Sequence, residues 1–143
     1  MDAKLLFVFV YLIVDFIYVV LSKPYYNAEF KKVQNADFPS LTDEPLRIIG
    51  ILGAYTAMAL GWYFLAAGLA DKWVKENKFG SPYIAGLAAG AIYGFALIGT
   101  YNFTNYLAFK NYSTNLVIRD TLWGTSWTAL SVMLYVVYMQ SNK

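Results

Sequence analysis

Four long apolar stretches constrain the fold of this chain more than any other feature of its sequence. They run over approximately Leu5–Ser22, Leu46–Ala70, Tyr83–Phe109 and Leu116–Met139. A helix that spans a bilayer needs about 20 largely apolar residues, within a range of roughly 17 to 25. The stretches therefore predict an all-α bundle of four transmembrane helices with up-down topology, in which both chain ends lie on the same side of the membrane.

The composition indicates a single, multi-pass integral membrane domain over residues 1–143. Of the 143 residues, 59% are hydrophobic, 19% are aromatic and only 14% are charged. Four spans and their loops use the whole chain, so no separate soluble domain is expected. A net charge of +2 gives no support for nucleic acid as a partner, and the expected partner is the lipid bilayer. Lys and Arg residues occur on both sides of the bundle, which leaves its orientation and the identity of the membrane open.

The segment 23–45 between the first two stretches is predicted to be an aqueous loop. From Tyr25 onward it carries several charged residues and two prolines, with a short interfacial helix expected near 28–35. The stretch before it has one alternative interpretation, because Lys4 followed by a short apolar core is typical of a cleaved signal peptide. Asp15 interrupts that core and no small-residue cleavage site follows, so we favour a span.

Two strips of small residues are predicted to serve helix packing. They comprise Gly53, Ala57 and Gly61 in the second stretch and Gly86, Gly90 and Gly94 in the third. Residues four apart lie on one side of a helix, and small residues there let another helix backbone come close. This glycine-zipper pattern predicts that the strips face each other or a neighbouring helix, and contact with lipid or a ligand is the alternative.

Polar residues of three stretches are predicted to meet in one half of the membrane. With a rise of about 1.5 Å per residue, Asp15 and Asn102 lie about 10 Å from the side that carries the 23–45 loop. Asn105 and Asp120 lie about 6 Å from it by the same measure. Because an ionised group in hydrocarbon is costly, these residues are expected to point into a common interior. The candidate polar cluster is Asp15, Tyr18, Tyr101, Asn102, Asn105, Arg119, Asp120 and Trp123.

The absence of His and Cys excludes imidazole and thiolate chemistry. Imidazole-bound zinc, haem histidines, disulfides and the commonest general base are thereby removed. We therefore predict no metal site and no catalytic residues, and the cofactor, if any, is unknown. An enzyme ranks below the other classes, although two carboxylates could perform acid-base work.

Two motifs resemble a known family. The run Thr100–Asn105 reads Thr-Tyr-Asn-Phe-Thr-Asn, and after a short turn Arg119–Gly124 reads Arg-Asp-Thr-Leu-Trp-Gly. Together with the early Asp15, these motifs resemble the DUF2177 family of small predicted membrane proteins. Its members carry a Tyr-Asp-Leu-Thr-Asn-like segment in the third span and an Asp-x-x-Trp-Gly segment in the fourth. The resemblance covers nearly the whole chain and implies the fold and the site, but no activity. Asn102 stands where the family usually has Asp, so the site of this chain lacks one acidic group.

Two classes of function are compatible with the polar cluster. In the first it is a small-solute or proton site of a transporter-like or channel-like protein. Asp15 and Asp120 are then titratable groups, Asn102 and Asn105 are polar ligands, and Arg119 is their counter-ion. In the second the protein is a structural or assembly component of a cellular or viral membrane, and the cluster holds the bundle together. Because four spans are few for a transporter, we expect a homo-oligomer or a larger membrane assembly.

Overall fold

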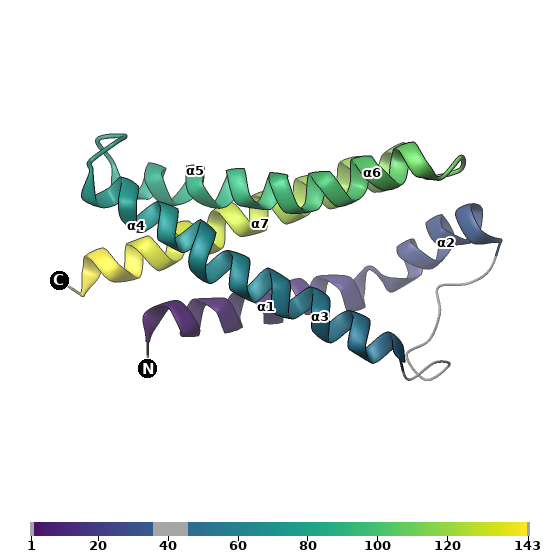
Figure 1. Ribbon diagram of the computed structural model, residues 1–143, viewed down its shortest axis with the longest axis horizontal. Coiled ribbons are helices and arrows are strands. Elements are labelled where there is room, and N and C mark those ends of the chain that lie inside the picture. The colour runs from purple at the N-terminus through teal and green to yellow at the C-terminus, as the bar shows by residue number, and fades with distance from the viewer. Residues whose placement is uncertain (1, 36–45, 143) are drawn as a thin grey trace.

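The computed structural model describes residues 2–35 and 46–142, and in these residues the chain is helical apart from short turns, with no strand. Two π-helical turns, Gly61–Ala66 and Phe95–Gly99, lie within the second and third long helices. The α-helices, shown in Figure 1, are α1 (Ala3–Leu21), α2 (Lys23–Gln34), α3 (Leu46–Leu60), α4 (Ala67–Lys75), α5 (Pro82–Gly94), α6 (Thr100–Ala108) and α7 (Thr114–Ser141).

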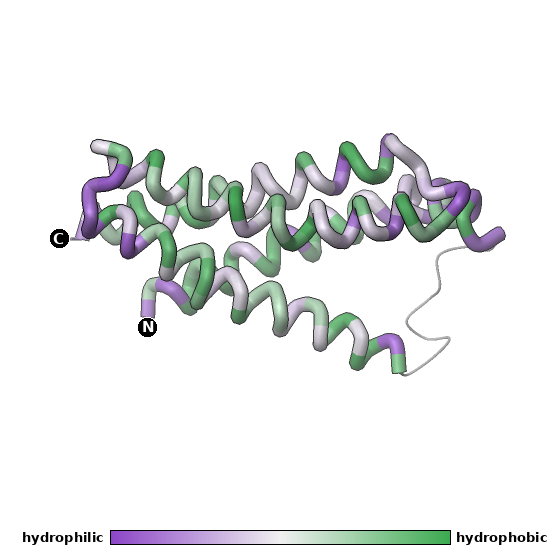
Figure 2. Tube along the Cα trace, turned by 45° about the horizontal axis from the view of Figure 1, so that its top comes forward, coloured by the Kyte–Doolittle hydropathy of each residue, from purple (hydrophilic) through white to green (hydrophobic). Residues whose placement is uncertain are grey.

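Four helices in the described residues are long and apolar enough to cross a membrane. They are Ala3–Leu21, Leu46–Lys75, Pro82–Ala108 and Thr114–Ser141. Hydrophilic residues gather at the two ends of the bundle (Figure 2). Both ends of the described chain lie at the end that also carries the turn between α4 and α5 (Figure 1). The predicted all-α, up-down bundle is therefore confirmed.

Local sequence accounts for the helix ends. The Asp2 side chain caps α1 by accepting a hydrogen bond from the Lys4 amide at 3.0 Å, and the Ser113 hydroxyl caps α7 by accepting one from Leu116. Proline at the start of α5 loses no hydrogen bond, since the first amides of a helix have no partner within it. Gly80 precedes that start with a φ of +65°, a left-handed conformation that suits glycine.

A helix occupies the first part of the segment that was predicted to be an aqueous loop. α2 begins directly after α1 at Lys23 and runs to Gln34, so the short helix expected near 28–35 starts earlier than predicted. Pro24 did not prevent it because a proline is tolerated in the first turn. Glu29 is buried, and hydrogen bonds from Lys32 and Ser113 hold its pKa below the usual value. The rest of the predicted loop, 36–45, lies outside the described residues.

The glycines of the third long helix lie against α7, and α5 and α7 make the most extensive helix contact in the structure. A Cβ atom built on Gly90 would lie 2.6 Å from the Thr128 carbonyl oxygen and 2.7 Å from the Ala129 Cα atom. Gly86 and Gly94 are similarly close to the α7 backbone. Only residues without a side chain permit this approach.

The predicted strip of the second long helix, Gly53, Ala57 and Gly61, does not face the glycines of the third. Gly53 and Ala57 are exposed, and a Cβ on Gly53 would meet nothing within 4 Å. A Cβ on Gly61 would overlap the Tyr93 ring, whose hydroxyl donates to the Met58 carbonyl at 3.4 Å. Because this ring stands between the helices, α3 has no buried residue and diverges from the bundle toward its outer end (Figure 1).

A polar contact at mid-depth joins the second long helix to α7. The Trp62 side chain is fully buried and its Nε1 donates to the Ser131 hydroxyl at 2.8 Å. The rings of Tyr11 and Tyr135 pack against the Trp62 ring at centroid distances of 6.3 and 5.8 Å. An indole N–H buried among apolar groups needs such an acceptor, so this pair fixes the position of the helix.

We predict that Gly90→Ala lowers the free energy of unfolding by about 1 to 3 kcal/mol, because the new methyl group overpacks the α5–α7 contact. Gly53→Ala is the matched control and should be neutral or stabilising by about 0.5 to 1 kcal/mol, since alanine favours a helix and meets no neighbour there. Thermal or denaturant unfolding in detergent measures both. Equal stability of the two variants would contradict the close contact.

Candidate functional site

Two carboxylates from different helices line one cavity. Asp15 on α1 and Asp120 on α7 border a space of about 140 Å³. Val19, Met58 and Ile98 also line this space. Four aromatic rings form the rest of its walls. We call this space the two-aspartate cavity, defined by Asp15, Asp120, Tyr18, Tyr26, Tyr101 and Trp123.

Asp15 is held by two neighbours that donate to it. Its Oδ1 accepts a hydrogen bond from Trp123 Nε1 at 3.3 Å, and its Oδ2 accepts one from the Tyr55 hydroxyl at 3.4 Å. Spacings of four and three residues place Tyr11, Asp15 and Tyr18 on one face of α1. The carboxylate therefore lies on the side of α1 that faces α7, as this spacing predicts.

Asp120 has a single short hydrogen bond to α2. The Tyr26 hydroxyl donates to its Oδ1 at 2.6 Å. Burial, followed by this bond, raises the pKa of Tyr26 well above its ordinary value. Tyr26 is thus neutral and available as a donor. The bond links the helix outside the membrane spans to the cavity.

Arg119 forms no salt bridge with Asp15 or Asp120, although its positive charge acts on Asp120. Its Nε donates to the Tyr18 hydroxyl at 3.2 Å and its Nη2 to the Ser22 hydroxyl at 3.3 Å, while the guanidinium carbon lies 4.2 Å from the centre of the Tyr25 ring. Among the described residues, neither Asp15 nor Asp120 forms a salt bridge. Consecutive residues of a helix point in different directions, which explains why Arg119 turns away from its neighbour.

Asn102 and Asn105 do not line the two-aspartate cavity and belong to a polar network beside it. Asn102 is fully buried, its Nδ2 donates to the Thr121 hydroxyl at 3.3 Å, and its Oδ1 accepts from the Tyr112 hydroxyl at 3.1 Å. Burial raises the pKa of Tyr112 to about 12, and Asn105 interacts with the same hydroxyl. These bonds join α6 to α7 and to the turn between the helices. Tyr101, which borders the two-aspartate cavity, interacts with both Asn105 and Tyr112, so the asparagines adjoin the cavity without lining it.

Sequence reasoning missed two residues of the site, Tyr26 and Tyr55. Tyr26 follows Ser22 by four residues and so continues the stripe of Asp15 and Tyr18. That signal was overlooked because Pro24 and the nearby charges favoured a loop. Tyr55 carries no signal that separates it from the other tyrosines of a chain with 13 of them.

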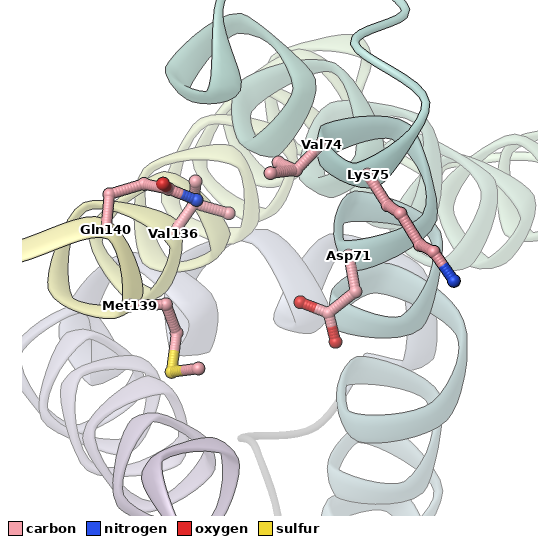
Figure 3. Close-up of a pocket in the computed structure, with 6 residues that line it drawn as sticks. All are labelled: Asp71, Val74, Lys75, Val136, Met139 and Gln140. Atoms are coloured by element: carbon pink, nitrogen blue, oxygen red, sulfur yellow. The ribbon is translucent and has the colours of Figure 1, made fainter. Parts of the chain in front are cut away.

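A second cavity lies at the end of the bundle that carries both chain ends. It has a volume of about 210 Å³ and is bordered by α4 and α7. Figure 3 shows Asp71 of α4 on one side and Met139 and Gln140 of α7 on the other. Asp71 is engaged by a salt bridge with Lys4 at 2.6 Å and by the Tyr135 hydroxyl at 2.9 Å. Its charge is therefore balanced, unlike the charges of the two-aspartate cavity.

These features define a multi-pass integral membrane protein with a polar cavity in one half of the bundle. No group of three His, Cys, Asp or Glu side chains in the described residues could hold a metal ion. The chain belongs to the DUF2177 family of predicted membrane proteins, whose model matches residues 3–137. Comparisons with curated proteins and with solved structures give no match.

We predict that Tyr112→Phe destabilises the protein by about 1 to 3 kcal/mol, because it leaves the buried Asn102 oxygen without a donor. Tyr106→Phe is the control: its hydroxyl makes only an exposed contact with Thr114, and its loss should change stability by no more than about 0.5 kcal/mol. Unfolding curves in detergent provide the comparison. If the two variants unfold alike, the asparagine network does not stabilise the α6–α7 junction.

Proposed function

We propose that the two-aspartate cavity is the small-solute or proton site of a transporter-like or channel-like membrane protein. The observation that supports the proposal is the pair Asp15 and Asp120, which border one cavity without a salt bridge to any described residue. Their negative charges repel each other, and Arg119 offsets part of the charge of Asp120. A proton or another positive species would relieve this repulsion in a medium where an unpaired charge is costly.

The location of the cavity favours access from one side. It lies toward the end of the bundle that carries α2, since Tyr26 of that helix borders it. Toward the other end the interior is packed around the Trp62–Ser131 hydrogen bond and the bond from Thr128 to the Tyr11 hydroxyl. Passage across the membrane would therefore require this packed half to open, as alternating access does in other transporters.

An assembly of several copies forms part of this proposal. α3 has no buried residue and exposes a row of aliphatic side chains, including Ile48, Ile49 and Leu52. In a bilayer this face contacts lipid or another copy of the chain. A homo-oligomer would give the few spans of one chain the extra wall that a transport path requires.

A structural role is the second candidate, and the network of Asn102 favours it. Its donor and its acceptor are both satisfied, by Thr121 and Tyr112, as expected of groups that hold helices together. The carboxylates of the two-aspartate cavity accept hydrogen bonds but form no salt bridge with a described residue. The two candidates thus draw on different residues and can be tested separately.

We predict that Asp15→Asn reduces proton flux into liposomes to the level of protein-free vesicles and leaves the melting temperature within a few degrees of the parent. The amide keeps the shape of the carboxyl group and an acceptor oxygen for one of its two donors, and it removes a charge that has no salt-bridge partner. Flux is followed with an internal pH-sensitive dye under a pH gradient, and melting is measured on the same preparation.

Asp71→Asn is the matched control, because this carboxylate also accepts from a tyrosine hydroxyl but lies outside the cavity. It should retain the flux. A parent protein without flux under a pH gradient, combined with an Asp15→Asn variant that melts earlier, would refute the transport proposal in favour of the structural one.

A further inference from the structure

We infer that the two-aspartate cavity binds a small organic ammonium ion, a monovalent cation that carries a few carbon atoms. This inference rests on the proposed function and specifies the solute. It combines three observations on the same space: the charge of its walls, the aromatic character of its walls and its size.

The charge around the cavity fits one monovalent cation. Asp15 and Asp120 contribute two negative charges when ionised, and Arg119 at the outer margin contributes one positive charge. The balance is a single negative charge. One ammonium ion would neutralise it, whereas a divalent ion would leave an excess positive charge in a membrane interior.

The aromatic walls favour an organic cation over a bare metal ion. The Tyr18 and Trp123 rings stack with their centroids 4.0 Å apart, and Trp127 continues the stack at 6.4 Å from Trp123. Faces of such rings attract ammonium and guanidinium groups, most strongly when water is excluded. The walls carry carboxylate and tyrosine oxygens, but no three His, Cys, Asp or Glu side chains of the described residues are placed to hold a metal ion together.

The guanidinium group of Arg119 also lies against aromatic rings. The carbon of the Arg119 group lies 4.2 Å from the centre of the Tyr25 ring and 5.8 Å from that of the Tyr18 ring. The Arg119 guanidinium, which is itself an organic cation, is therefore already held by aromatic rings at the margin of the cavity. One of these rings, that of Tyr18, also borders the cavity and stacks on Trp123.

The volume sets an upper limit on the occupant. The space measures about 140 Å³. A cavity of about 150 Å³ accommodates a benzene molecule, which has a carbon skeleton of similar size to tetramethylammonium. Ions from methylammonium to tetramethylammonium therefore fit, whereas larger lipid-like amines would extend beyond it.

The test is a titration of the purified protein in detergent with tetramethylammonium chloride, followed by melting temperature and by tryptophan fluorescence. We expect a saturable response, which sodium chloride at equal ionic strength and the neutral isostere tert-butanol do not produce. Trp123→Leu should weaken the apparent affinity about tenfold, the value of a desolvated cation–π contact. Asp15→Asn and Asp120→Asn should abolish the response, and Asp71→Asn should retain it.

Two results would overturn the inference. An equal response to tert-butanol would show that the cavity recognises apolar volume and not charge. A lack of response to both tetramethylammonium and methylammonium, in a protein that still conducts protons into liposomes, would refute the organic cation and leave the proposed proton site intact. A cooperative melting transition of each variant without ligand guards against misfolding. Tyr106→Phe, which lies outside the cavity, should bind like the parent.

Discussion

The close contact between α5 and α7 is the interaction on which the rest of the structure depends. Glycines at positions 86, 90 and 94 let the α7 backbone lie directly on α5. With one side of α7 committed to this contact, its large side chains point to the other side. Trp127 there donates to the Tyr11 carbonyl at 3.0 Å, which docks α1 onto the pair. The position of α1, and with it of Asp15, thus follows from glycine packing elsewhere in the bundle.

The motif Asp-Thr-Leu-Trp-Gly at the start of α7 now has a physical explanation, residue by residue. Asp120 and Trp123 face the cavity, and Thr121, which points elsewhere, binds Asn102. Gly124 has no side chain because a Cβ atom would overlap Ile98. Ile98 lies in the π-helical turn of the third long helix and also borders the cavity. A single turn of α7 therefore connects the cavity, the asparagine network and the packing on the neighbouring helix.

The sequence predicted the membrane-spanning elements that carry the polar residues better than the direction in which each side chain points. The length and apolarity of the four stretches were enough to predict the four spans. The spacing of Tyr11, Asp15 and Tyr18 placed Asp15 correctly because α1 is a regular helix. Asn102 and Asn105 were assigned to the same interior on the assumption of an unbroken helix from Gly94 onward. The π-helical turn Phe95–Gly99 adds one residue to that turn and rotates α6 by about 100° relative to α5. No sequence pattern marks such a turn, so the sequence did not indicate that Asn102 would bond to Thr121 and Tyr112 beside the cavity instead of lining it.

The two polar regions of the bundle differ in a way that bears on function. The network of Asn102 is complete, and its value for stability is sufficient reason for its presence. The carboxylates of Asp15 and Asp120 have only hydroxyl and indole donors among the described residues, although Arg119 is adjacent in sequence. Apolar side chains of similar size in place of such buried charges commonly leave a protein as stable or make it more so. Stability therefore does not explain why two carboxylates stand at this cavity, and this is why a site for a positively charged species is proposed there.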